Sequence, residues 1–418
     1  MRNPPMDPRF FSQNRKNLVT KLDANSLALV FSAEPAIRNG DQLHPWRQDS
    51  NFFYLTGLEQ PGLKLLLIPE KGNSHQEILF IPKRDPKREQ WEGAKLSIEV
   101  ASQRSGIKKV MLLEDFEAYF FKAQEYKEQL FTEINPIFPR QPITENHRFL
   151  AELGLRLPGL QVKKLAPFLV PLRARKQKPE LEQLKKSLTI IDQGLRRVAQ
   201  FIEPGVLEYQ VEAELSHHYL FNGCPRLGFE TIVAGGANAC TLHYIENDQP
   251  LKDRDLVLVD TGAEYGMYSG DVTRVFPVNG KFTDRQRHCY EAVLEVNKTF
   301  IRKLRANLSW QELAQEAGKI QGEVYKRYGL IEDSKDYLKV GYHRIGHSLG
   351  LDVHDVQIQD WPLRPGAVIT VEPGLYLPEE GIGIRIEDDV LLTETGAEVL
   401  SASIPKEVAA IEDLMRRT

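Results

Sequence analysis

The chain has 418 residues, of which 41% are apolar and 27% charged, and its formal net charge is -4. This length exceeds what one hydrophobic core usually serves, so we expect two domains in a soluble globular enzyme. Acids and bases are interspersed, which argues against the broad basic face that nucleic acid would need. The N-terminus lacks the apolar stretch of a signal peptide, and apolar runs such as residues 63–69 are too short to span a bilayer. We therefore expect no nucleic-acid partner and no membrane.

The cysteines are few and show no metal-type spacing. Cys224, Cys240 and Cys289 form an odd and sparse set. Such a set fits a reducing compartment better than a secreted domain built on disulfides. We predict a cytoplasmic protein.

The first part of the chain predicts a small α/β domain. Residues 26–32, 63–68 and 78–81 are short apolar runs separated by Gly, Pro and Asn, as buried strands are. A change follows, where Pro167 and then a basic cluster precede Pro179, a favourable first helical residue. We place the domains at residues 1–170 and 171–418.

The second part begins with helices. Apolar residues recur every three or four positions from Leu181 to Val198, which predicts a long helix from Pro179 that ends before Pro204. A second helix is expected over residues 209–223. Two capping boxes announce two more helices, Thr283 with Gln286 and Ser309 with Glu312, and the last helix should stop at Gly329.

Strand-like segments occur between and after these helices, at residues 256–260, 273–276, 367–372 and 382–391. Helices on one side of a mainly antiparallel sheet are the arrangement that this order favours. The predicted class of the second domain is therefore α+β.

Several carboxylates lie at the ends of these strands. Asp260 ends one strand and Asp271 begins the next, so a hairpin could bring them side by side, although Asp before a Gly-rich turn is also an ordinary turn former. In residues 382–387 the period of two places Arg385 and Glu387 on the face opposite the isoleucines, where a charged pair could simply be solvated. Glu372 ends another strand before a Pro-Gly turn and is equally ambiguous alone.

The histidines favour a site. Residues 342–355 hold three of the ten histidines, His343, His347 and His354, with glycines at 346 and 350 that allow close backbone approach. A lone buried histidine is more often a hydrogen-bonded core residue, whereas three in one Gly-spaced loop indicate a site. The adjacent His217 and His218 lie in a helical pattern and are interpreted as surface or core residues.

Together the pattern predicts a two-metal carboxylate site made by Asp260, Asp271, His347, Glu372 and Glu387. Two like charges about 4 Å apart repel by roughly 4 kcal/mol at an effective dielectric constant near 20, so an empty cluster could not keep all four acids ionised. Either several pKa values rise or two divalent cations neutralise the acids. We favour two cations, and hard oxygen donors suit manganese or magnesium.

The motifs that carry these residues resemble those of a known family. They are residues 260–263, 269–274, 346–355, 371–376 and 383–388, together with residues 46–57 in the first domain. The chain resembles the Xaa-Pro aminopeptidases, or aminopeptidases P. These are metallopeptidases with the pita-bread fold of prolidase and methionine aminopeptidase and a creatinase-like N-terminal domain. The resemblance covers nearly the whole chain.

The resemblance implies roles for the metal ligands. Asp271 and Glu387 would bridge two manganese ions, Asp260 would hold one of them, and His347 and Glu372 would complete the other. A water shared by the two cations would attack the peptide bond. Glu372 would take up its proton, or would serve as a ligand alone.

The resemblance also implies residues around the substrate. His243 and His354 would hydrogen-bond the substrate backbone or the tetrahedral oxygen, and His343 would line the proline pocket. Arg385 and Tyr376 would orient the ligands or the substrate. As alternatives, His343 could support a ligand and Arg385 could screen the carboxylates.

The implied activity is hydrolysis of the N-terminal Xaa-Pro bond of peptides with proline in second position. An Xaa-Pro dipeptidase is the nearest alternative, and a metal-free creatinase-type or noncatalytic relative is a more distant one. Residues 88–93 look like the segment by which the family's N-terminal domain approaches a neighbouring subunit, which would imply a homodimer or homotetramer. The alternative for this segment is a plain surface turn.

Overall fold

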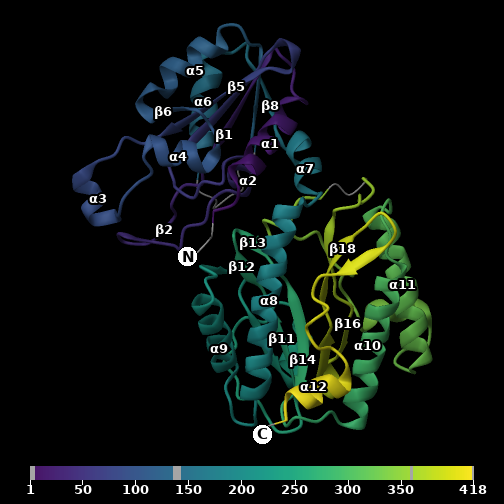
Figure 1. Cartoon of the computed structure of the whole chain (residues 1–418). Helices are drawn as coiled ribbons and strands as arrows, with labels where there is room; N and C mark the ends of the chain where they lie inside the picture. Colours follow the sequence, from purple (N-terminus) through teal and green to yellow (C-terminus); the bar gives the residue numbers. More distant parts are fainter. Residues whose placement is uncertain (1–4, 135–142, 358–360, 417–418) are drawn as a thin grey trace. The chain divides into compact units, whose positions relative to one another are not determined.

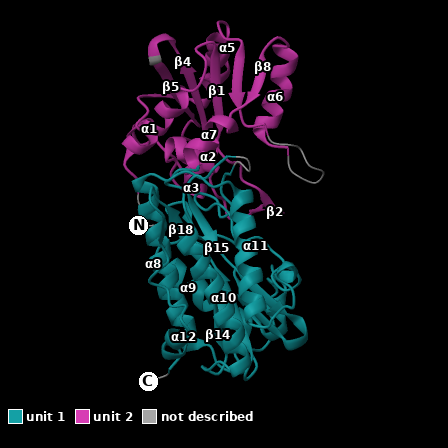
Figure 2. Cartoon of the chain, turned by 90° about the vertical axis from the view of Figure 1, so that its right-hand side faces the viewer, with its two compact units in different colours: residues 1–4, 174–418 teal, residues 5–173 magenta. Residues whose placement is uncertain are grey.

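A computed structural model describes residues 5–134, 143–357 and 361–416. The chain forms two compact units, residues 5–173 and residues 174–418 (Figure 2). Among the described residues, no helix combines the length and the apolar character that crossing a membrane requires.

The N-terminal unit contains one mixed six-stranded sheet and a small hairpin. Its strands are β1 (Ser26–Phe31), β2 (Ile37–Asn39), β3 (Gln42–Leu43), β4 (Lys64–Pro69), β5 (His75–Ile81), β6 (Lys109–Leu112), β7 (Gln129–Thr132) and β8 (Gln161–Lys164). The sheet order is β6-β5-β4-β1-β7-β8, and β2 pairs with β3. β4 is antiparallel to both β1 and β5, whereas the outer pairs are parallel. The three predicted strands are confirmed as β1, β4 and β5.

The helices of this unit are α1 (Pro8–Val19), α2 (Ser50–Thr56), α3 (Pro86–Glu92), α4 (Ile98–Ser105), α5 (Phe116–Gln124), α6 (Glu145–Arg156) and α7 (Ala166–Arg173) (Figure 1). Leu29 of β1 and Leu66 of β4 belong to the buried core with the aromatic residues of α5. The ring of Phe80 in β5 meets that of Phe116 edge to face at 5.2 Å between centroids. The N-terminal unit is thus an α/β layer structure, as predicted.

The C-terminal unit has the predicted helices. They are α8 (Lys178–Phe201), α9 (Glu208–Phe221), α10 (Asp284–Lys303), α11 (Trp310–Arg327) and the short α12 (Val408–Leu414). Both capping boxes form, with Thr283 accepting from the N–H of Gln286 and Ser309 from that of Glu312. Gly329 follows α11 with φ 66°, a left-handed conformation that ends a helix.

The strands of this unit are short and are antiparallel wherever the described residues pair. They are β9 (Arg226–Leu227), β10 (Ile232–Gly235), β11 (Leu256–Thr261), β12 (Ala263–Tyr265), β13 (Tyr268–Ser269), β14 (Val272–Pro277), β15 (Val368–Val371), β16 (Gly374–Leu377), β17 (Ile382–Arg385), β18 (Asp388–Leu392) and β19 (Ala397–Val399). Helices α8 and α9 pack together beside β10 and β12, and α10 and α11 pack together beside β15 and β17. The α+β class is confirmed.

The prediction of one strand over residues 382–391 was wrong. The chain forms β17 and β18, separated by Ile386 and Glu387, and the facing strand is interrupted at Glu372 and Pro373. Val371 still pairs with Asp388, and Gly374 with Arg385. Proline lacks the N–H that a ladder needs, which gives a physical reason for the interruption. Two predicted metal ligands therefore lie opposite each other in a break of one ladder.

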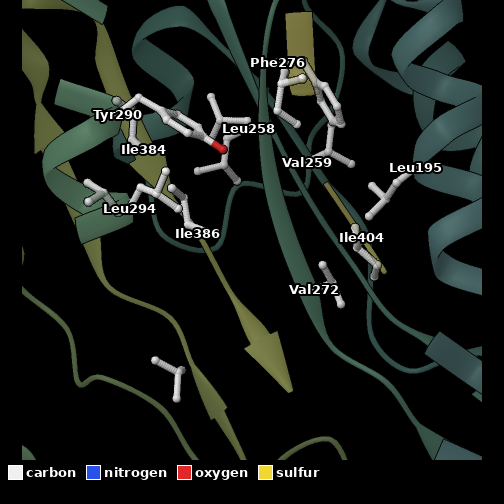
Figure 3. Packing of buried hydrophobic residues seen from close by; sticks show 14 of the residues in the cluster. Leu195, Leu258, Val259, Val272, Phe276, Tyr290, Leu294, Ile384, Ile386 and Ile404 are labelled. Atoms are coloured by element: carbon white, nitrogen blue, oxygen red, sulfur yellow. The ribbon is translucent and has the colours of Figure 1, made fainter. Parts of the chain in front are cut away.

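Both faces of residues 382–387 are buried, so the charged side chains of this segment are not solvated. Figure 3 shows Ile384 and Ile386 beside Tyr290 and Leu294 of α10 in the hydrophobic core. On the other face, Arg385 is 4% exposed and Glu387 is 2% exposed. Burying a charge without partners is costly, so these groups need other charges or polar atoms near them.

Candidate metal centre

The hairpin of β11 and β14 brings Asp260 and Asp271 to one place. Asp260 lies opposite Thr273 in the ladder, and Asp271 immediately precedes β14. Side chains alternate along a strand, so residues 271 and 273 face the same way as their partner Asp260. Both carboxylates line a cavity of about 970 Å³.

The other three predicted ligands line the same cavity. Asp271, His347 and Glu387 each offer a ligand atom, and these atoms all lie within 4.8 Å of one another. Nε2 of His347 is 3.4 Å from Oδ2 of Asp271 and 3.7 Å from Oε1 of Glu372. Its Nδ1 lies 3.1 Å from the carbonyl oxygen of Ser348. Donation from Nδ1 would leave Nε2 as the free ligand atom of a neutral imidazole.

Arg385 occupies the centre of a hydrogen-bond network behind these acids. It donates to Oδ2 of Asp260 at 2.6 Å, to the hydroxyl of Tyr376 at 3.0 Å and to Oγ1 of Thr273 at 3.1 Å. Thr273 in turn donates to Oε2 of Glu387 at 2.7 Å. Among the described residues, Oδ1 of Asp260 is buried and has no hydrogen-bond partner. A bound cation would supply the partner that this buried carboxylate oxygen lacks.

Electrostatics give the cluster a strong affinity for positive charge. Burial raises the pKa of Asp271 to about 6 and that of Glu372 to about 7. Burial, followed by repulsion from Asp271 and Glu372, raises the pKa of Glu387 well above its ordinary value. Burial opposes protonation of His347, but the adjacent Asp271 and Glu372 outweigh it and raise its pKa to about 9. A bound divalent cation would stabilise these acids in their ionised form. Without a cation the same acids bind protons instead.

Four of the five residues expected around the substrate line the cavity, namely His243, His343, His354 and Arg385. The ring of His354 packs edge to face on that of His347, with 4.2 Å between centroids. Burial and then the charge of Arg385 lower the pKa of His343 to about 4, so this imidazole is neutral near pH 7. Tyr376 is 1% exposed and is not among the lining residues, but its hydroxyl lies 2.8 Å from Nε2 of His343.

Two threonines at the site had no predicted role. Besides Thr273, Thr370 accepts the backbone N–H of His347 at 3.0 Å, and its hydroxyl lies 3.4 Å from Oε1 of Glu372. Each threonine stands two positions from a predicted ligand on a strand. The alternation of faces was therefore a signal that could have found both.

Residues 182–394 match metallopeptidase family M24, just over half of the chain. The chain belongs to metallopeptidase family M24. Residues 11–131 match the aminopeptidase P N-terminal domain. The Xaa-Pro aminopeptidase of Haemophilus influenzae is 36% identical over 97% of this M24 chain and 96% of its own length.

Solved structures agree with this membership. A Bacillus anthracis structure assigned as an aminopeptidase P has a TM-score of 0.95 and 36% identity, covering 98% of each chain. Aminopeptidase P of Escherichia coli with the inhibitor Pro-Leu has a TM-score of 0.89 and 33% identity, covering 99% of each chain. The predicted family, the predicted fold and the enzyme class, a metallo-aminopeptidase, are confirmed.

Proposed function

We propose that this chain hydrolyses the N-terminal Xaa-Pro bond of peptides with two divalent cations in the site described above. The observation that carries the proposal is the convergence of Asp271, His347 and Glu387 within 4.8 Å on a cavity of about 970 Å³. The Xaa-Pro aminopeptidase of Haemophilus influenzae matches the chain over nearly its full length, which supports the choice of substrate.

The proposed ligands divide between two cations. Asp271 and Glu387 would be shared by both cations, Asp260 would hold one of them, and His347 and Glu372 would hold the other. Manganese is the proposed metal, because the donors are four carboxylates and one imidazole. When bound, such a pair lowers the pKa of water and polarises the scissile carbonyl.

Side chains of the protein itself would accept the proton and would orient the ligands and the substrate. Glu372 is the proposed proton acceptor, because its carboxylate lines the cavity beside His347, with Oε1 3.7 Å from Nε2. His243 and His354 line the cavity and are proposed to bind the substrate backbone or the developing oxyanion. Arg385 would orient Asp260, to which it donates at 2.6 Å.

Proline gives the proposed site its specificity. A bond to proline is a tertiary amide without an N–H, so proteases that grip an extended backbone handle it poorly. A neutral His343, whose ring lies 5.6 Å from that of Tyr376 between centroids and is tilted 56° to it, offers a flat wall for the proline ring. We propose that His343 lines the proline pocket and that Tyr376 orients it.

The test uses the full chain stripped of metal and then reloaded with Mn²⁺. Hydrolysis of Arg-Pro-Pro should depend on added Mn²⁺, and His347→Ala should lose both activity and bound metal. His217→Ala is the matched control, because His217 is exposed on α9 and stacks on Phe221 away from the cavity lining. Activity of the stripped enzyme equal to that of the reloaded enzyme would contradict the proposal.

The same assay separates the alternatives. Cleavage of Gly-Pro without cleavage of Arg-Pro-Pro would identify a dipeptidase. Absence of bound metal after Mn²⁺ incubation, together with turnover of creatine, would identify a creatinase-type enzyme. Absence of metal and of any turnover would identify a noncatalytic relative.

We further propose a homodimer or homotetramer in a reducing, cytoplasmic compartment. Residues 88–93 include the end of α3, where Trp91 is 91% exposed, and tryptophan is a residue type enriched in contacts between subunits. Cys224, Cys240 and Cys289 are all free. Sedimentation of the wild type and of Trp91→Ala tests the oligomer, and a monomeric wild type would contradict it.

A further inference from the structure

A side chain outside the cavity joins the two halves of the interrupted ladder. Val371 and Ile386 each precede one of the facing acids, Glu372 and Glu387. The carbonyl oxygens of Val371 and Ile386 both accept from Nδ2 of Asn297, each at 3.2 Å. One amide group of α10 therefore bridges the two backbone segments that carry the acids.

The backbone of each acid is held on its other side as well. The N–H of Glu372 donates to the carbonyl of Ile345 at 2.8 Å, and the N–H of Glu387 donates to the carbonyl of Thr273 at 3.2 Å. These contacts tie each acid to the segment that carries another proposed ligand, His347 or Asp271. One backbone bond joins the two segments inside the break, from the N–H of Ile386 to the carbonyl of Pro373 at 3.3 Å. The amide of Asn297 adds a second cross-link, at the residue before each acid.

Asn297 is fully buried and satisfied on both ends. It is 0% exposed and lies on the face of α10 that carries Val293, Val296 and Phe300. Its Oδ1 accepts from Nζ of Lys406 at 2.9 Å, and Lys406 also pairs with Asp388 at 2.5 Å. Asparagine is a poor helix former, and a buried amide is costly unless it is bonded. A residue of this kind in an apolar face needs a local reason, and the two carbonyls supply one.

We infer that Asn297 is a positioning residue that fixes the spacing of Glu372 and Glu387 for cation binding. Its amide hydrogens hold the carbonyls before both acids, so one planar group acts together with the bond from Ile386 to Pro373 in setting the distance between the two segments. Without this group the long bond from Ile386 to Pro373 is left to hold the break, and the two acids gain freedom to move apart. The inference rests on the proposed metal site.

The test measures Mn²⁺ binding to the stripped full chain by isothermal titration calorimetry. Asn297→Asp keeps the shape of the side chain but replaces the amide donor with an oxygen. Asn297→Ser removes the bridging amide without adding a charge. The matched control is Gln286→Leu on the same helix, where Nε2 donates to the carbonyl of Arg254 at 2.7 Å. Thermal melting of all four proteins accompanies the titrations.

Removal of a residue that supports a metal ligand typically weakens metal binding by about 10–100-fold. We expect a decrease of this size in the Mn²⁺ affinity of both Asn297 variants, but not in that of Gln286→Leu. At saturating Mn²⁺, kcat should fall while KM for Arg-Pro-Pro stays near the wild-type value. Wild-type affinity in the Asn297 variants would overturn the inference and leave the proposed function intact. Affinity that falls in the control as well, in proportion to the melting temperature, would also overturn it. A wild type that binds no Mn²⁺ would overturn the proposed function together with the inference.

Discussion

The guanidinium of Arg385 and the carboxylate of Asp260 form a buried ion pair, with Nη2 donating to Oδ2 at 2.6 Å. The same guanidinium also donates to Tyr376 and Thr273, so one planar group sets the orientation of three neighbours. A proposed metal ligand thus has one oxygen occupied by a cationic side chain and the other, Oδ1, buried without a partner among the described residues.

Arg385→Lys should therefore lower kcat/KM by about 10–100-fold, because an ammonium cannot reproduce the three directions of the guanidinium. Arg285→Lys is the control, since Arg285 donates to both oxygens of Glu380 at the protein surface. Steady-state kinetics with Arg-Pro-Pro measure the effect. Equal activity of the two variants would show that the geometry at Arg385 is not needed.

Glu372→Gln should retain bound Mn²⁺ but lose kcat by roughly 10²–10⁴-fold, the contribution typical of a positioned proton-transfer group. The amide keeps an oxygen for a cation but cannot take up a proton at neutral pH. Metal analysis and kinetics on the same sample separate the two effects. Full turnover with both metals bound would refute the role of proton acceptor and leave Glu372 as a ligand.

Asp388→Asn should destabilise the C-terminal unit by about 3–5 kcal/mol, because it leaves the buried Arg274 and the half-buried Lys406 without a counter-charge. Asp388 pairs with Arg274 at 2.9 Å and with Lys406 at 2.5 Å. Although burial opposes ionisation, these two cations lower the pKa of Asp388 to about 2. Urea denaturation gives the free energy of unfolding.

The control for this change is Glu380→Gln, which breaks the surface pair with Arg285 and should cost under about 1 kcal/mol. The low pKa of Asp388 also determines how its contribution to stability depends on pH. Its contribution to stability is present above the ordinary value of 3.8 and is lost as the pH falls through 2. Similar losses in the two variants would contradict the argument.

The opposite dependence of stability on pH is expected for Glu180. Burial raises its pKa from 4.5 to about 7, although it accepts from the N–H of Gln177 and the hydroxyl of Tyr268. An acid with a raised pKa binds a proton on folding, so its contribution to stability is present below 4.5 and is lost as the pH rises through 7.

We therefore expect the free energy of unfolding of the wild type, relative to Glu180→Gln, to fall between about pH 5 and pH 8. Chemical denaturation across this range measures the difference. Glu182→Gln, at an exposed position of the same helix, is the matched control and should show no such trend. A difference for Glu180→Gln that stays constant or grows with pH would contradict the prediction.

Much of this fold follows from local signals in the sequence. The capping boxes at Thr283 and Ser309 act within one turn, so they predict helix starts without any knowledge of tertiary structure. The alternation of Ile382, Ile384 and Ile386 likewise predicted a strand. It could not predict the break at Ile386, because the buried pattern continues through it and the cause, Pro373, lies on the facing segment.

The site was predictable in its residue types but not in its connections. Five acidic and histidine residues in Gly-rich motifs indicated a metal cluster. The contacts of Arg385 with Asp260 and Thr273, and the bridge made by Asn297, join segments 74 to 125 residues apart. Period and spacing describe only neighbours along the chain, so they carry no signal for such pairs.

The five proposed donors are spread from residue 260 to residue 387 and meet only when β11, β14, β15 and β17 have come together. An unfolded chain offers a cation nothing comparable, so mass action would draw the folding equilibrium toward the native form as free cation rises. Scarcity of the ion in a cell would then shorten the lifetime of the folded protein as well as slow its turnover.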